Sequence, residues 1–141
     1  MTDAPAYRTN AEIEEVVKRF EECAYSPEEF VHTKHLTVAA WYFWHLEPDV
    51  AREKMRAGLR RFIAHHGKNG YHVTITEFWL QLVERSVLQR KVHHREPVSI
   101  VNEIIERFRY KNLIYEYFSR DRLNSADAKA AWIEPDIKST N

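Results

Sequence analysis

Two histidines stand three residues apart at the start of the most apolar stretch of this chain, at His32 and His35. On a helix, side chains three positions apart share a face, so the two imidazoles can approach a common atom. Burial favours neutral imidazole, which ligates divalent transition metals. The pair therefore predicts half of a metal site. The alternative is a structural pair whose ring nitrogens are hydrogen-bonded within the core, because this spacing arises easily by chance among 8 histidines in 141 residues.

A third histidine, His72, lies in the segment Tyr71-His-Val-Thr-Ile-Thr76, directly before a predicted helix. Loops at helix ends often hold functional groups on a rigid scaffold. We expect His32, His35 and His72 to bind a divalent transition metal (Zn, Fe or Cu), with one position open for water or substrate. Tyr71, His72 and Thr76 are the expected catalytic groups. Two alternatives are a metal-free acid–base site around a small-molecule substrate and a solvated turn histidine beside a routine helix cap.

The other histidines and the single cysteine are weaker candidates. His66 falls near the inward face of its helix and is a candidate fourth ligand, whereas Cys23 is expected to fill apolar space. Glu77 is expected to cap its helix rather than to bind metal. The remaining histidines are expected at exposed or polar positions: His45, His65, His93 and His94.

A basic stripe favours a different class of function. Arg52, Arg56 and Arg60 repeat every four residues and so share one helix face. That face predicts, as the alternative to a histidine site, a non-enzymatic interaction module in which the histidines are structural. Such stripes more often form a solvated surface. Haem held by one axial histidine is a third alternative. The sequence contains no P-loop, dinucleotide-binding or serine-hydrolase motif.

The elements that position these residues are expected to be helical almost throughout, because glycines number 3, prolines number 5 and apolar residues recur at helical spacing. An apolar helix over about 33–46 is expected at the centre. Before it, a helix is predicted over about 11–24 after an N-cap at Asn10, followed by a turn at Ser26–Glu29. After it, one helix is predicted from Pro48 to His66, with Gly67 beyond its end, and another from a capping box at Thr74 to about 92. The last two are predicted from Ser99 through Phe108 to about 118 and from Ser125 to about 132. This pattern predicts an all-α bundle of about six helices in one domain, 1–141, with extended tails at 1–9 and 134–141.

Size and composition restrict the class of protein. A chain of 141 residues is one domain with a sizeable core. The 21 basic and 21 acidic side chains cancel, so no nucleic-acid partner is expected. The longest apolar run, 38–44, is too short to span a membrane, and the first residues lack a signal peptide. With one cysteine, no intramolecular disulfide can form. We expect a soluble, cytoplasmic protein, and the sequence leaves its oligomeric state open.

Three motifs resemble a family of small, uncharacterised bacterial all-helical proteins. They are Phe30-Val-His-Thr-Lys-His-Leu36 followed by Ala40-Trp-Tyr, then Tyr71-His-x-Thr-x-Thr76, and finally Trp132-Ile-Glu-Pro-Asp136. The resemblance covers about residues 30–136. Val73 stands where the family carries an acidic residue. The resemblance implies that the histidines and tyrosine of these motifs belong to one shared pattern, and it brings no activity, cofactor or substrate.

Overall fold

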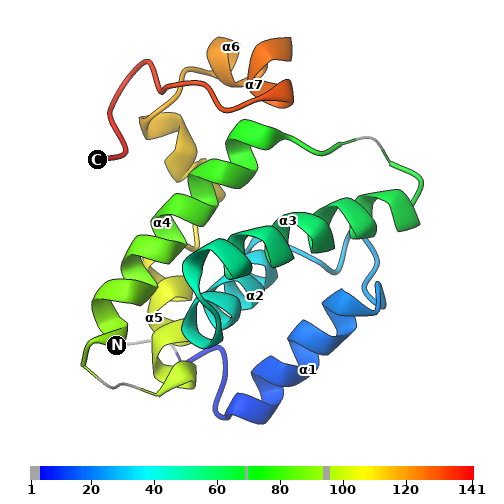
Figure 1. The fold of residues 1–141 in the computed structure, drawn as a ribbon, viewed down its shortest axis with the longest axis vertical. Coiled ribbons are helices and arrows are strands. Elements are labelled where there is room, and N and C mark those ends of the chain that lie inside the picture. The colour runs from blue at the N-terminus through cyan, green and yellow to red at the C-terminus, as the bar shows by residue number, and fades with distance from the viewer. Residues whose placement is uncertain (1–3, 69, 94–95) are drawn as a thin grey trace.

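The fold is all-α, as the sequence predicts. The computed structural model describes residues 4–68, 70–93 and 96–141, so His94 lies outside the described residues. These residues form eight helical segments and no strand (Figure 1). In chain order they are α1 (Asn10–Glu21), α2 (His32–His45), α3 (Pro48–His65), α4 (Val73–Lys91), α5 (Pro97–Phe108), the 3-10 helix η1 (Lys111–Glu116), α6 (Arg120–Leu123) and α7 (Ala126–Ala130).

Helix α2 is the central element, and its position confirms the prediction of a central apolar helix. It packs against α1, α3, α4 and α5, which explains why it is apolar on nearly every side. This helix also buries a polar side chain, Thr37, completely. Its hydroxyl donates to the Thr33 carbonyl at 2.8 Å and hydrogen-bonds the Tyr7 hydroxyl at 3.0 Å. Burial is tolerated because these contacts replace water.

The first helix differs from its predicted bounds at both ends. Its N-cap is Thr9 rather than Asn10, and Thr9 forms a reciprocal capping box with Glu12. The Asn10 side chain instead accepts a hydrogen bond from the Val98 amide at 3.1 Å, which joins the starts of α1 and α5. The helix ends at Glu21 because Cys23 takes a left-handed conformation (φ 55°). Ala24, inside the predicted range of the helix, consequently lies beyond its end and is exposed.

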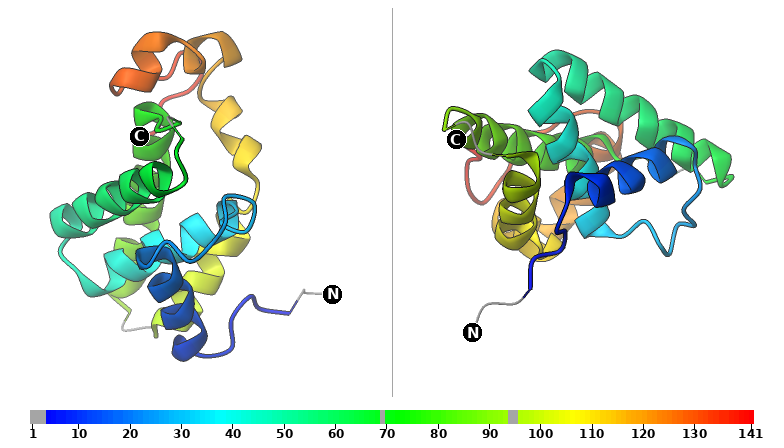
Figure 2. Two further views of the ribbon diagram at one scale, coloured as in Figure 1. Left: turned by 90° about the vertical axis from the view of Figure 1, so that its right-hand side faces the viewer. Right: turned by 90° about the horizontal axis from the view of Figure 1, so that it is seen from below.

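The C-terminal part was predicted less well than the rest. The expected continuation of α5 to about 118 is wrong, since α5 stops at Phe108 and η1 follows after a break. Helix α6 was not predicted, whereas α7 has the predicted cap, Ser125. Figures 1 and 2 show α6 and α7 beside the start of α4, at the opposite end of the molecule from α1. Within the described residues, no helix has the length and hydrophobicity needed to cross a bilayer.

A glycine in the middle of α3 allows close packing of the aromatic core. An added Cβ at Gly58 would lie 2.6 Å and 2.7 Å from two ring atoms of Phe20. That ring is fully buried and stacks on Phe30 with a centroid distance of 4.7 Å. The Phe20 ring therefore has no space into which it can retreat.

We expect Gly58→Ala to destabilise the protein by about 2 kcal/mol. Alanine favours helices by about 1 kcal/mol over glycine, but overpacking against a fixed ring costs more than this gain. Urea denaturation of the two proteins measures the net change. In a Phe20→Leu background the same substitution is expected to cost about 1 kcal/mol less, because the obstructing ring is gone. An equal cost in both backgrounds would contradict the steric explanation.

Candidate functional site

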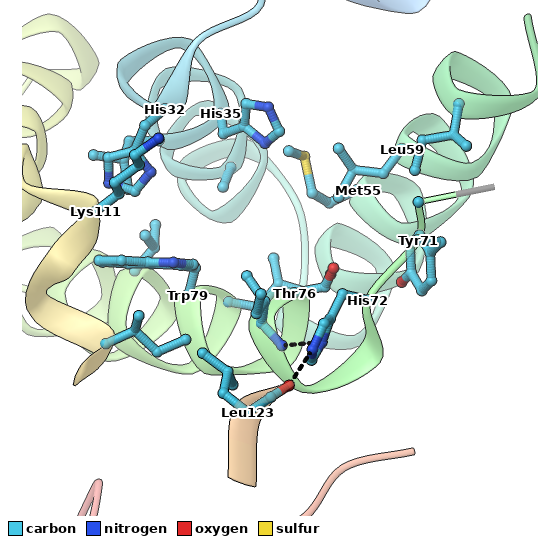
Figure 3. Close-up of a pocket in the computed structure, with 18 of the residues that line it drawn as sticks. His32, His35, Met55, Leu59, Tyr71, His72, Thr76, Trp79, Lys111 and Leu123 are labelled. Atoms are coloured by element: carbon cyan, nitrogen blue, oxygen red, sulfur yellow. Dashed lines mark hydrogen bonds between the residues drawn. The ribbon is translucent and has the colours of Figure 1, made fainter. Parts of the chain in front are cut away.

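A cavity of about 480 Å³ lies between α2, α3, α4 and η1, and α6 closes one side of it (Figure 3). Its walls are mainly apolar, with one indole, Trp79. The aliphatic and methionine side chains that line it are Leu36, Ala39, Met55, Leu59, Ile63, Ile75, Leu80, Val83, Ile114 and Leu123. Five predicted site residues line the same cavity, namely His32, His35, Tyr71, His72 and Thr76. The structure therefore brings the predicted residues together in one place.

His35 presents a neutral ring to this cavity. Its Nε2–H donates to the Phe30 carbonyl at 3.2 Å, and the ring stacks on Phe30 with a centroid distance of 4.2 Å. Burial lowers the pKa of His35 to about 4, the nearby His32 acts in the same direction, and the hydrogen bond to Phe30 opposes them. Because a carbonyl only accepts, Nδ1 is left as an acceptor. Figure 3 shows one ring nitrogen of His35 on the side of Met55.

His32 lies one turn earlier on α2. Its Nε2–H donates to the Phe108 carbonyl at 2.8 Å, and its ring meets the Trp79 indole edge-on at a centroid distance of 4.6 Å. Burial lowers the pKa of His32 and the positive charge of Lys111 lowers it further, while the bond to Phe108 opposes both. His32 is therefore also neutral near pH 7, with Nδ1 as its remaining acceptor.

His72 is the N-cap of α4, a position that the sequence analysis wrongly assigned to Thr74. Its Nδ1 accepts the Ile75 amide hydrogen at 3.1 Å, and its Nε2–H donates to the Leu123 carbonyl at 2.7 Å (Figure 3). Both ring nitrogens are thus occupied. His72 ties α4 to α6 and has no free nitrogen for a metal ion or for proton transfer.

Thr74 fastens the C-terminal segment instead of capping the helix. It is fully buried, donates to the Ala131 carbonyl at 2.8 Å and accepts from the Ile133 amide at 3.3 Å. One hydroxyl therefore satisfies two main-chain groups of the segment that follows α7.

We expect Thr74→Val to destabilise the protein by about 2 kcal/mol, because it keeps the shape of the side chain but leaves both main-chain groups unpaired. Ala131 is exposed, so water can reach its carbonyl and the loss stays moderate. Thr74→Ser is the control: it keeps the hydroxyl and should cost about half as much. Urea denaturation measures both, and limited proteolysis should cleave the C-terminal segment faster only in the valine variant. Equal behaviour of the two variants would exclude the hydrogen bonds as the cause.

The Tyr71 hydroxyl is a buried group without a hydrogen-bond partner among the described residues. Burial raises the pKa of Tyr71, and two neighbours oppose this rise: the Arg60 guanidinium, 4.7 Å from the ring centroid, and the Thr76 hydroxyl. In Figure 3, Tyr71 lies at the far end of the cavity from His32.

The hydrogen bonding does not suit the three-histidine metal site. Each of His32, His35 and His72 uses its Nε2–H on a main-chain carbonyl, and only the first two retain a free nitrogen. Across residues 4–68, 70–93 and 96–141, no group of three or more His, Cys, Asp or Glu side chains could hold a metal ion. His66, the candidate fourth ligand, donates to the Tyr25 carbonyl at 3.0 Å and lines no part of the cavity.

The arginine stripe is occupied within the molecule. Arg56 makes two bonds to the Glu77 carboxylate, at 2.6 Å and 2.8 Å, which join α3 to α4. The expectation that Glu77 caps its helix is therefore wrong. Arg52 pairs with Asp49 and Glu84, and Arg60 covers Tyr71. These contacts use the stripe to hold two walls of the cavity together.

The sequence did not predict a role in the site for two polar residues of the cavity wall. Lys111 and Asn112 begin η1 and line the cavity beside His32. Both were expected inside a continuous helix. The break after Phe108 turns them toward the cavity, and no local sequence motif marks this break.

Searches of protein-family models, of curated proteins and of solved structures found no match to this chain. The fold and the site thus define an all-α protein with a partly open cavity of ligand size. Inference about its function depends on the chemistry of that cavity.

Proposed function

We propose that this protein binds a small, largely apolar organic molecule in the cavity between α2, α3 and α4. The observation that carries the proposal is the cavity itself. The cavity is partly open to the outside of the molecule and its walls are mainly apolar. Its volume of about 480 Å³ lies within the range of small-molecule sites.

The polar groups of the cavity are few and separately placed, as in binding sites that orient a ligand. The free Nδ1 of His35 accepts a hydrogen bond, whereas the Tyr71 hydroxyl is buried out of reach of the cavity. Trp79 offers a flat apolar surface beside His32, at the end of the cavity away from Tyr71 (Figure 3). The ligand that suits this arrangement is a mostly apolar molecule with one or two polar groups.

The proposal assigns binding and no catalytic step. His72, the expected acid–base group, has both nitrogens engaged. The pKa of His35, about 4, makes it a weak base at neutral pH. A metal ion is not part of the proposal, because only two of the three histidines keep a free ring nitrogen.

Titration with the neutral fluorescent probe N-phenyl-1-naphthylamine tests the proposal. We expect saturable binding of one probe per chain, with energy transfer from tryptophan to the probe. Trp79→Phe should remove most of this transfer because Trp79 lines the cavity. Absence of saturable binding would refute the proposal. If untagged protein contains stoichiometric metal and a His35→Gln variant does not, the result would support a metal site instead of an organic ligand.

A further inference from the structure

One end of the cavity carries a positive charge that no acidic side chain balances. Among the described residues that line the cavity, none is Asp or Glu. The three histidines are neutral in the hydrogen-bonded forms given above. Of the lining residues that the structure describes, Lys111 alone therefore carries a full charge.

Lys111 lies between the cavity and the outside of the molecule. Three residues, His32, Lys111 and Asn112, line both the cavity and a shallower depression on the surface, and we call them the polar mouth. Figure 3 shows His32 and Lys111 at the end of the cavity opposite Tyr71. A ligand that reaches this end of the cavity therefore lies beside the lysine.

The charge of Lys111 is available to a ligand. In the part of the chain that the structure describes, this lysine makes no ion pair. The outer depression also contains Glu28 and Arg109, and Arg109 has its own partner, Glu106, at 3.7 Å. The ammonium remains near enough to lower the pKa of His32, so its charge reaches the inner side of the mouth.

The hydrogen-bonding state of the polar mouth determines which of its groups can contact an anion. Because Nε2–H of His32 is used by Phe108, its Nδ1 can only accept and would repel an ionised carboxylate in direct contact. The donors left for an anion are the Lys111 ammonium and the Asn112 amide. Charge-assisted hydrogen bonds of this kind are stronger than neutral ones.

We infer that the ligand is an organic acid, whose apolar body lies against Trp79 and whose carboxylate is held at the polar mouth by Lys111 and Asn112. This inference rests on the proposed function and adds the chemical class and the orientation of the ligand. An amine of the same skeleton meets the lysine charge and is disfavoured. An alcohol of the same skeleton gains the apolar contacts alone.

Competition with the bound probe tests the inference, using octanoate, octanol and octylamine at pH 7.5. We expect octanoate to displace the probe about tenfold more effectively than octanol, and octylamine to be the weakest. Lys111→Gln should reduce the affinity for octanoate about tenfold and leave octanol unchanged. Lys111→Arg should restore octanoate binding. Lys129→Gln serves as the matched control, because it removes one positive charge at an exposed position on α7.

The two proposals fail in different ways. If octanol competes as well as octanoate, or if Lys111→Gln leaves the affinity for both compounds unchanged, the organic-acid inference is wrong. The cavity would still be a binding site. If the probe itself does not bind, both proposals are wrong. As a second measurement, bound octanoate should raise the pKa of His32 in NMR titration, because a nearby anion favours imidazolium. An unchanged His32 titration with octanoate bound would place the carboxylate elsewhere and overturn the inference.

Discussion

Replacing Ala39 by phenylalanine is expected to lower the affinity for the neutral probe by about tenfold or more while the protein stays folded. The Ala39 methyl group lines the cavity from α2, so a phenyl ring there has empty space to enter. Filling the cavity removes the volume that the ligand needs, and it costs little stability because the ring displaces no neighbour. Fluorescence titration measures the affinity, and urea denaturation measures the stability.

The adjacent alanine provides the matched control. Ala40 is on the same helix and is fully buried, but it does not line the cavity. We expect Ala40→Phe to destabilise the protein by about 3 kcal/mol through overpacking, with probe affinity retained at temperatures where the variant is folded. If the two variants are equally destabilised, the cavity is closed in solution. If Ala39→Phe binds the probe normally, the probe occupies another site.

Acidification is expected to destabilise the protein through His35 by about 3 kcal/mol between pH 6.5 and 4. The pKa of this histidine is about 4 in the folded protein against an ordinary value of 6.5. In that interval the unfolded chain binds a proton at this position and the folded protein does not. The contribution of His35 to the free energy of unfolding is therefore fully present above pH 6.5. It falls as the pH is lowered toward 4 and does not recover below pH 4.

His35→Gln isolates this contribution. Glutamine does not titrate, and its amide can still donate toward the Phe30 carbonyl. Urea denaturation from pH 7.5 to 4 should show a shallower loss of stability for the variant than for the unaltered protein, because the carboxylates titrate alike in both. The pKa of His32 is also lowered. His32 therefore accounts for part of the pH dependence of stability that remains in the variant. Parallel curves for the two proteins would show that His35 is not shielded from solvent.

Much of the fold follows from periodicity within the sequence. The central helix was predicted within one residue of its observed bounds, because a segment that is apolar on every side must be surrounded. Pro48 and Gly67 correctly marked the limits of α3, through the fixed φ of proline and the positive φ of glycine. Ser125 was correctly identified as a cap for the same kind of local reason.

The errors arise where distant residues compete with local signals. Asn10, Thr74 and Glu77 all have types and spacings that suit helix caps. In the folded protein they bind Val98, Ala131 and Arg56, far away in the sequence, because these bonds satisfy other buried or charged groups. Local propensity was overruled by tertiary partners that no short window contains.

The sequence by itself determined the helical class, the central helix and the choice of histidines, since each depends on residue type and on spacing along one helix. Only the tertiary structure decided what those histidines do. Their Nε2–H groups meet carbonyls from the Phe30 turn, from the end of α5 and from α6, and these partners fix the tautomers and leave a space between the rings. A hydrogen-bond partner supplied across the fold depends on how the helices pack, and packing is a property of the whole chain.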